Sequence, residues 1–217
     1  MHFARITHSV WEWMLDRIFP PSKRLTEVRA LTIQLLPIDI RTHTLLGRSI
    51  TSLASYKNTD VKNAIRVLKY EKSMHAARLF GELLSEYLLP MLAEESLLSA
   101  REVVLVPMPL GNKRLRERGY NQVTQVLSTL SEYGIELPVR EDLLKRTRET
   151  RPQTTLSRKG RLENVDGAFE APPGLSLSNF HILLIDDVTT TGATLHHAAL
   201  ALERAGAKVT CLALTHA

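Results

Sequence analysis

Residues 182–194 read ILLIDDVTTTGAT, and this stretch is the strongest indication of the fold in the sequence. Its first four residues are apolar and predict a buried β-strand, which runs into the neighbouring carboxylates Asp186 and Asp187. A polar turn follows, and apolar residues then recur at helical spacing, namely Leu195, Ala198, Ala199 and Leu202. The stretch therefore predicts a strand, a loop and an amphipathic helix, which is the repeating unit of a parallel α/β sheet.

The predicted loop has the features of an anion site. The backbone N–H groups of Thr190 to Thr194 lie at the start of the helix, where unpaired donors and the helix dipole attract a phosphate. Gly192 lets the chain curl closely around such a ligand, and open α/β sheets bind ligands at this end of their strands. Taken singly, paired aspartates also form Mg²⁺ sites in phosphoacceptor domains, and a Thr before a helix is often only an N-cap. The combined spacing favours a sugar-phosphate site.

The same stretch resembles the signature of type I phosphoribosyltransferases, which bind phosphoribosyl pyrophosphate (PRPP). The match runs from the apolar strand through both acidic residues to Thr-Gly-x-Thr, here residues 191–194. The resemblance implies that Asp186 and Asp187 are catalytic carboxylates along the ribose hydroxyls, and that they are the candidate protein ligands of a Mg²⁺ ion held mainly by the substrate. It also implies a 5′-phosphate loop that consists of Thr189, Thr190, Thr191, Gly192, Ala193 and Thr194.

Composition narrows the class of protein. The chain has 217 residues, of which 44% are hydrophobic, as expected for one globular domain with an extension or for two small domains. Its single cysteine, Cys211, lies in an apolar run, so we expect no disulfide, no zinc site and a reducing, cytoplasmic location. The sequence shows no signal peptide and no apolar run of the ~18 residues that a membrane span needs, so we expect no membrane insertion.

The net charge of +5 is unevenly distributed along the chain. Basic residues concentrate in residues 113–118 and 140–161. This density favours a polyanionic partner such as pyrophosphate, a nucleotide or nucleic acid. The alternative is a solvated face, which is the commoner fate of charge runs. Both stretches flank strand ends near the predicted phosphate loop, and this position favours the functional interpretation.

Periodicity organises the rest of the chain. It predicts helices near residues 9–19, 61–68, 76–91, 123–130 and 194–205, strands over 31–38, 50–54, 102–106, 182–185 and 208–214, and a long loop or hairpin over 140–175. Together with the resemblance, this order predicts an α/β protein of the type I phosphoribosyltransferase fold, with a mostly parallel sheet flanked by helices. Residues 1–55 are expected to form an N-terminal extension of helix and short strands, and residues 56–217 the phosphoribosyltransferase-like domain.

A second loop, residues 107–122, leaves the same edge of the sheet and faces the same ligand from the other side. The corresponding loop of type I phosphoribosyltransferases binds pyrophosphate, a role to which guanidinium groups are suited because they bind phosphate in bidentate fashion. The resemblance assigns this role to Pro107, Met108, Arg116, Arg118, Asn121 and Gln122. We also predict that one X-Pro bond, after Val106 or after Met108, is cis, the alternative being a rigid trans turn.

Residues 151–165 resemble the flexible loop that closes over the substrate in this superfamily. The candidate contact residues are Arg151, Gln153, Arg158 and Arg161. Closure would exclude water from a reactive ribosyl cation and so limit its hydrolysis. The alternative is a surface hairpin with solvated charges.

The motifs together are similar to the ComF family, which is associated with DNA uptake in competent bacteria. The similarity covers roughly residues 56–217 and rests on RERGYNQ at 116–122, PQTTL at 152–156, GAF at 167–169, the Asp186-Asp187 loop, Tyr56 and the Lys69-Tyr70 pair. Members usually carry a Cys-rich zinc ribbon near the N-terminus. Here no cysteine follows Pro20-Pro21, so the ribbon's role, such as docking to a helicase or to DNA, is not implied for this chain.

Two functions follow as hypotheses. The first is Mg²⁺-dependent transfer of ribosyl phosphate from PRPP, or from another sugar phosphate, to an acceptor that the sequence does not identify, with release of pyrophosphate. The second is a non-enzymatic competence module that binds single-stranded DNA, or a partner protein such as a competence helicase, through basic loops. Aromatic residues for base stacking are scarce at 6%; the candidates are Tyr120, which follows the first basic stretch, and Phe169, which follows the second.

Overall fold

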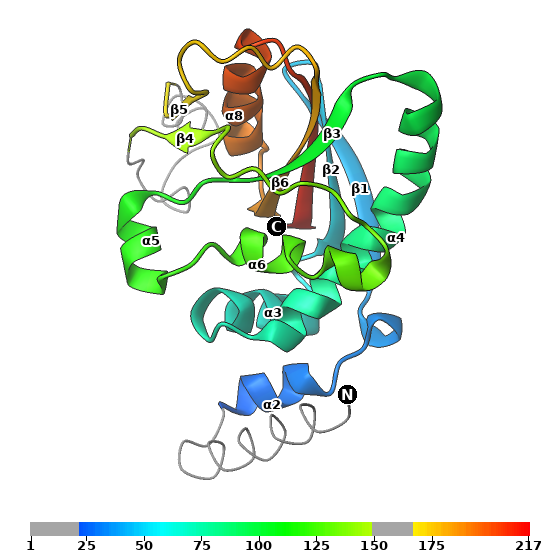
Figure 1. Ribbon diagram of the computed structural model, residues 1–217. Helices are drawn as coiled ribbons and strands as arrows, with labels where there is room; N and C mark the ends of the chain where they lie inside the picture. Colours follow the sequence, from blue (N-terminus) through cyan, green and yellow to red (C-terminus); the bar gives the residue numbers. More distant parts are fainter. Residues whose placement is uncertain (1–21, 149–166) are drawn as a thin grey trace, which may run out of the picture.

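The computed structural model describes residues 22–148 and 167–217, which form a five-stranded sheet covered by helices on both faces (Figure 1). The strand order is β1-β2-β7-β6-β3, and all neighbours are parallel except the hairpin of β1 and β2. The strands are β1 (Ile38–Leu45), β2 (Arg48–Ser55), β3 (Glu102–Pro107), β6 (Phe180–Thr189) and β7 (Lys208–His216). The predicted α/β architecture with a mostly parallel sheet is confirmed.

The helices divide between the two faces of the sheet. One face is covered by α3 (Thr59–Tyr70), α4 (Met74–Leu98) and α6 (Gln122–Leu127), and the other by α8 (Ala193–Arg204). Smaller elements are α2 (Lys23–Arg29), η1 (Ile33–Leu35), α5 (Asn112–Arg118), η2 (Leu130–Tyr133) and a two-stranded ribbon of β4 (Lys145–Arg146) and β5 (Phe169–Glu170). The helices predicted near residues 61–68, 76–91 and 194–205 are confirmed, whereas the one predicted over 123–130 ends at Leu127 and is followed by the separate turn η2. The helix predicted near residues 9–19 lies outside the described residues. The ribbon lies within the stretch 140–175 that was predicted as a long loop or hairpin.

Strand β6 shows how the apolar stretch builds both halves of the core. Because side chains alternate along a strand, Leu183 and Ile185 pack in the core under α3, α4 and α6, while Ile182 and Leu184 pack in the core under α8. All four side chains are fully buried. A strand that is apolar on both faces lies inside the sheet, and β6 does so between β7 and β3, as the buried strand that its sequence predicts.

The N-terminal part of the described chain contains one correction. Residues 31–38 do not form the predicted strand, because Ile33 and Leu36 are buried together at the spacing of a single helical turn, which η1 provides. The predicted strand over residues 50–54 is confirmed within β2, which joins the sheet through parallel pairing with β7. The expected boundary between residues 55 and 56 thus falls at the end of a strand of the shared sheet.

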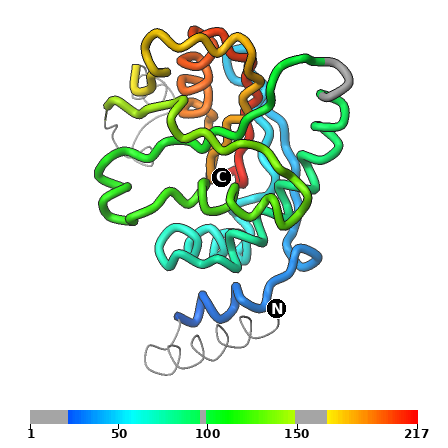
Figure 2. Tube along the Cα trace, in the orientation of Figure 1, coloured from blue at the N-terminus to red at the C-terminus, as the bar shows by residue number. Residues whose placement is uncertain are grey.

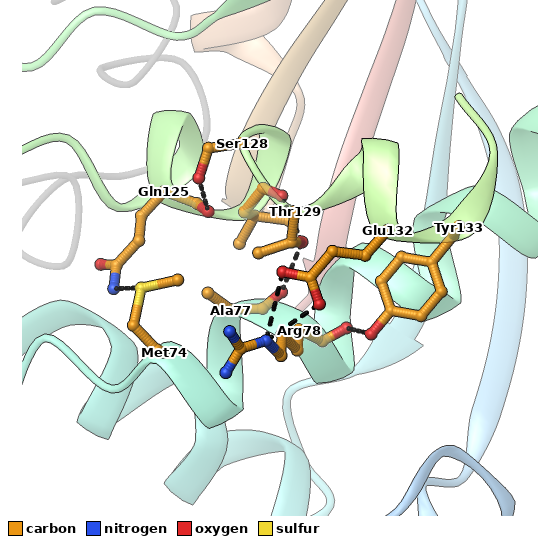
Figure 3. Close-up of polar contacts among 9 residues, drawn as sticks. Met74, Ala77, Arg78, Gln125, Ser128, Thr129, Glu132 and Tyr133 are labelled. Carbon is orange, nitrogen blue, oxygen red and sulfur yellow. Dashed lines mark hydrogen bonds and ion pairs between the residues drawn. The ribbon is translucent and has the colours of Figure 1, made fainter. Parts of the chain in front are cut away.

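Helix α4 packs against η2, the turn that follows α6 (Figure 3). Arg78 pairs with Glu132 at 3.0 Å, and the Tyr133 hydroxyl donates to the Arg78 carbonyl at 3.1 Å. A Cβ on Gly81 would overlap the hydroxyl of Thr129, so the close approach of the two elements requires glycine there. This packing fixes α6, whose first residue, Gln122, belongs to the site described below.

The turn after β3 contains a second correction. The described residues contain no cis peptide bond, so the prediction of a cis X-Pro bond after Val106 or Met108 is wrong. The chain keeps an extended course through Pro107, and the next N–H, from Met108, donates to the Ile185 carbonyl at 2.7 Å. In the described residues, no helix is both long and apolar enough to cross a membrane.

Candidate functional site

The loop after β6 and the first turn of α8 enclose a small pocket at the carboxyl edge of the sheet. The residues that line it are Asp186, Val188, Thr189, Thr190, Gly192, Ala193, Thr194 and Leu195. The N-cap of α8 is Gly192, which provides no side-chain cap, while Thr191 Oγ1 accepts a long 3.4 Å bond from Ala193 N. Of the predicted phosphate-loop residues, all except Thr191 therefore line one pocket around a helix N-terminus, which is suited to an anion.

Gly192 is required by both its conformation and its surroundings. Its φ of +82° lies in the left-handed region, which residues with a Cβ rarely adopt. A Cβ at this position would overlap Ile50 Cδ1 and lie 3.1 Å from His43 Nε2. Side chains of the β1–β2 hairpin thus pack directly against the loop at Gly192 and leave no room for a Cβ there.

The two aspartates lie within β6 rather than beyond it, because the strand continues to Thr189 through pairing with β7. Asp186 lines the pocket beside α8. Burial, and then the neighbouring carboxylate of Asp187, raise the pKa of Asp186 to about 7, although Lys69 and Arg146 partly offset this effect. The backbone N–H of Asp187 donates to Asp186 Oδ1 at 2.8 Å.

Asp187 lies in a different environment, among side chains of α3 and α6. Lys69 Nζ is 2.9 Å from Asp187 Oδ1, and the Gln122 amide donates to Asp187 Oδ2. Gln122 in turn accepts from Arg118 Nη1 at 2.7 Å. Asp187 and Lys69 are largely buried, with side chains 10% and 16% exposed. Lys69 is a site residue that the sequence analysis did not assign, and only its place in the Lys69-Tyr70 pair marked it.

The loop predicted to bind pyrophosphate includes helix α5, whose residues are all outside the core. Arg116 is exposed on it, whereas Arg118 is half-buried and bonded to Gln122. Asn121 holds the loop in place, because its Nδ2 donates to the Met108 carbonyl at 3.0 Å and its Oδ1 accepts from Val123 N at the start of α6. Met108 is buried. Arg116 and Arg118 therefore remain the members of this set that are suited to contact an anion.

Tyr120 fastens this loop to the end of α3. Its hydroxyl donates to the Leu68 carbonyl and accepts from Lys72 N at 3.1 Å. Burial raises the pKa of Tyr120 above its ordinary value. The predicted closing-loop residues Arg151, Gln153, Arg158 and Arg161 lie outside the described residues.

The described residues fit a weakly held magnesium ion better than a protein-made metal cage. Within residues 22–148 and 167–217, no group of three or more His, Cys, Asp or Glu side chains is arranged to hold a metal ion. Mg²⁺ commonly takes one or two carboxylates and completes its shell with water and substrate phosphates. The carboxylate of Asp186, at the rim of the anion pocket, is the donor that matches this pattern.

Comparison with known proteins finds relatives involved in competence and DNA utilisation. Competence protein F of Haemophilus influenzae is 34% identical over 105 residues, which are 47% of this chain and 44% of that protein. DNA utilization protein YhgH of Escherichia coli K12 is 28% identical over 199 residues, covering 90% and 74%. Competence protein ComFC of Streptococcus pneumoniae is 34% identical over 163 residues, covering 75% and 66%. The chain thus spans less than half of the first relative and about two thirds to three quarters of the others.

Among solved structures, a phosphoribosyltransferase from Corynebacterium diphtheriae aligns over 87% of this chain and 80% of its own, with a TM-score of 0.34 and 19% identity. A hypoxanthine phosphoribosyltransferase from Staphylococcus aureus aligns over 66% and 63%, with a TM-score of 0.34 and 16% identity. No family model matches the chain.

Proposed function

Because the chain belongs to the ComF family, we propose that it binds PRPP at the pocket after β6 and transfers the ribosyl phosphate to an acceptor, with release of pyrophosphate. One observation carries the proposal: Asp186 and the turn of Thr190 to Thr194 share one pocket at the N-terminus of α8. A turn of backbone N–H groups at a helix start binds a 5′-phosphate, and a carboxylate beside it reaches the sugar.

Asp186 in the pocket and the residues of the neighbouring loop would divide the chemistry among them. As the bond between the sugar and pyrophosphate breaks, positive charge develops on the ribose, and the ionised carboxylate of Asp186 stabilises it. Arg116 and Arg118 bind the departing pyrophosphate; a guanidinium has five donors, so the bond from Arg118 to Gln122 leaves capacity for an anion. Magnesium, when bound with the substrate, neutralises charge on the pyrophosphate. Asp187 holds the site through Lys69 and Gln122.

The test is calorimetric titration of PRPP with and without Mg²⁺. We expect Mg²⁺-dependent binding that Asp186→Asn weakens by at least about tenfold, because charged partners contribute more than neutral ones. Asp142→Asn is the matched control, since Asp142 is an exposed carboxylate that pairs with Arg140. Absence of binding by the wild-type protein, or equal binding by the two variants, would overturn the proposal. Pyrophosphate release in the presence of a library of acceptors then tests turnover.

A second candidate function, binding of single-stranded nucleic acid, is favoured by the surface of α5. None of its residues is buried, and it exposes the cations Lys113, Arg114 and Arg116. If these contact phosphates, Arg116→Ala lowers affinity for an oligonucleotide and reduces the slope of log affinity against log salt by about 0.7. Lys23→Ala removes another exposed cation, on α2, and leaves the affinity and the salt slope unchanged.

A further inference from the structure

The most exposed aromatic ring in the described chain lies beside the candidate site. Tyr70 is the last residue of α3 and is 71% exposed. Its neighbour Lys69 contacts Asp187. A large apolar ring held in solvent at the rim of a polar site is an arrangement that a ligand with an aromatic face would cover.

A cation lies over the Tyr70 ring. Arg118 Cζ is 5.3 Å from the centroid of the Tyr70 ring, within the range of a cation–π contact. Arg118 also bonds Gln122, and Gln122 bonds Asp187, which pairs with Lys69. Tyr70 is therefore held in a closed circuit of contacts that starts and ends at the candidate catalytic strand.

The other aromatic residues of the basic region are not available for stacking. Phe169 is only 5% exposed and packs in the core under α8. Tyr120 is half-buried and uses its hydroxyl on Leu68 and Lys72. The two residues that the sequence offered as stacking platforms are thus structural, and the exposed ring comes from a helix outside the basic stretches.

We propose that Tyr70, backed by Arg118, is the stacking surface for an unpaired nucleobase at the rim of the candidate PRPP site. Every base has a π-face that stacks on an aromatic ring, and arginine adds a cation–π contribution. The cations of α5 and Lys72 would meet the attached phosphates. The base belongs either to single-stranded DNA or to a free nucleotide, and the chemistry is the same for both. The inference deepens the proposed function and rests on it for the neighbouring phosphate site.

The experiment measures the affinity of a labelled oligothymidylate by fluorescence anisotropy and of adenosine 5′-monophosphate by calorimetry. The proteins are wild type, Tyr70→Ala, Tyr70→Phe and Leu115→Ala. We expect Tyr70→Ala to lower the affinity for one or both ligands by about 5- to 150-fold, which corresponds to the free energy measured for a stacked base. Tyr70→Phe keeps the ring and should retain wild-type affinity. Leu115→Ala removes an exposed apolar side chain from the neighbouring α5 without removing a ring, so it keeps wild-type affinity. An abasic oligonucleotide of equal length binds wild type and Tyr70→Ala equally.

The ligand that responds identifies the source of the base. Loss confined to the oligonucleotide indicates DNA, and loss confined to the nucleotide indicates an acceptor or effector. Equal affinities of wild type and Tyr70→Ala, equal loss with the abasic oligonucleotide, or no binding of either ligand to wild type would overturn the proposal. A PRPP titration of the same proteins separates the two claims: loss of stacking alone leaves PRPP affinity intact, whereas failure of PRPP to bind wild type refutes only the proposed function.

Discussion

Asp186 and Asp187 are consecutive residues of β6, yet their carboxylates lie on opposite faces of the sheet. Asp186 lines the pocket at the start of α8, and Asp187 is held by Lys69 of α3 and Gln122 of α6. The alternation of side chains along a strand requires this division. One carboxylate is consequently placed to meet a ligand, while the other ties the strand to the opposite layer of helices.

The raised pKa of Asp186 predicts a pH dependence of stability. An unfolded aspartate titrates near its ordinary pKa of 3.8, and burial raises the folded value to about 7. Between these values the folded protein keeps a proton that the unfolded chain has lost, so the free energy of unfolding falls as pH rises. Asp186→Asn removes this penalty, and we expect a gain on the order of 4 kcal/mol at about pH 8. Thermal melts across the pH range measure it; a lower melting temperature for Asp186→Asn at about pH 8 would contradict it.

The same titration predicts how ligand affinity depends on pH. Only the ionised carboxylate of Asp186 attracts Mg²⁺ and the positive charge on the sugar. We therefore expect PRPP affinity to rise as pH increases through about 7, the raised pKa of Asp186. Asp186→Asn should flatten this profile, and a profile that is unchanged in Asp186→Asn would assign the titration to another group.

The pair of Lys69 and Asp187 predicts strong coupling between two substitutions. Lys69→Met leaves a largely buried carboxylate without its cation, which we expect to cost about 3 kcal/mol of unfolding free energy. Adding Asp187→Asn removes the uncompensated charge, so the double variant should be more stable than additivity gives. Urea denaturation of the wild type, the two single variants and the double variant measures their free energies of unfolding and hence the coupling. Arg140→Met, which breaks a more exposed pair with Asp142, is the control and should cost less than about 1 kcal/mol.

Gly192 allows the contact with the hairpin to be tested one atom at a time. Gly192→Ala meets both a positive φ and the Cδ1 atom of Ile50, and we expect a loss of about 3 kcal/mol. Gly47→Ala has a similar φ of +80° with nothing within 4 Å, so it should cost only about 1 kcal/mol. Ile50→Val removes the clashing atom itself. The combination of Ile50→Val with Gly192→Ala should thus be less destabilised than the sum, and strict additivity would show that the clash does not operate.

Tyr120→Phe tests the tie between the basic loop and α3. The hydroxyl makes two backbone contacts, to Leu68 and Lys72, so we expect a cost of about 1–2 kcal/mol. Tyr133→Phe removes a single contact, to Arg78, and should cost less. Hydrogen exchange gives a local readout, because the Lys72 N–H should lose protection in Tyr120→Phe alone. Unchanged exchange at Lys72 would refute the tie.

The strand-loop-helix unit could be predicted from residues 182–194 because its apolar run and its turn are contiguous in the sequence. The contacts of Asp187 could not, since Gln122 is 65 positions away and the packing of α6 on α4 and on the sheet brings it there. The contact of Tyr70 with Arg118 could not be predicted either, because the two residues come from distant segments of the chain. Helix α5 buries none of its residues, so it has no apolar periodicity to reveal it.

The hairpin illustrates the opposite case, a readable pattern that was missed. In β1 the sequence IDIRTHTL starts by alternating Ile38 and Ile40 with Asp39 and Arg41, and a period of two residues is typical of a strand. The apolar run before it looked more like a strand but contains a buried helical turn at Ile33. A short run of apolar residues does not by itself distinguish the two.

The position of β7 constrains how this protein folds. It is the latest of the described strands in the sequence, yet it lies between β2 and β6 near the middle of the sheet (Figure 2). Until β7 is made, the hairpin has no partner in the sheet, and β2 presents an open inner edge of unpaired backbone groups. Pairings between distant segments form slowly. During synthesis the edge of β2 therefore stays unpaired until β7 is made. An unpaired strand edge can pair with another chain, so this edge exposes the nascent chain to aggregation.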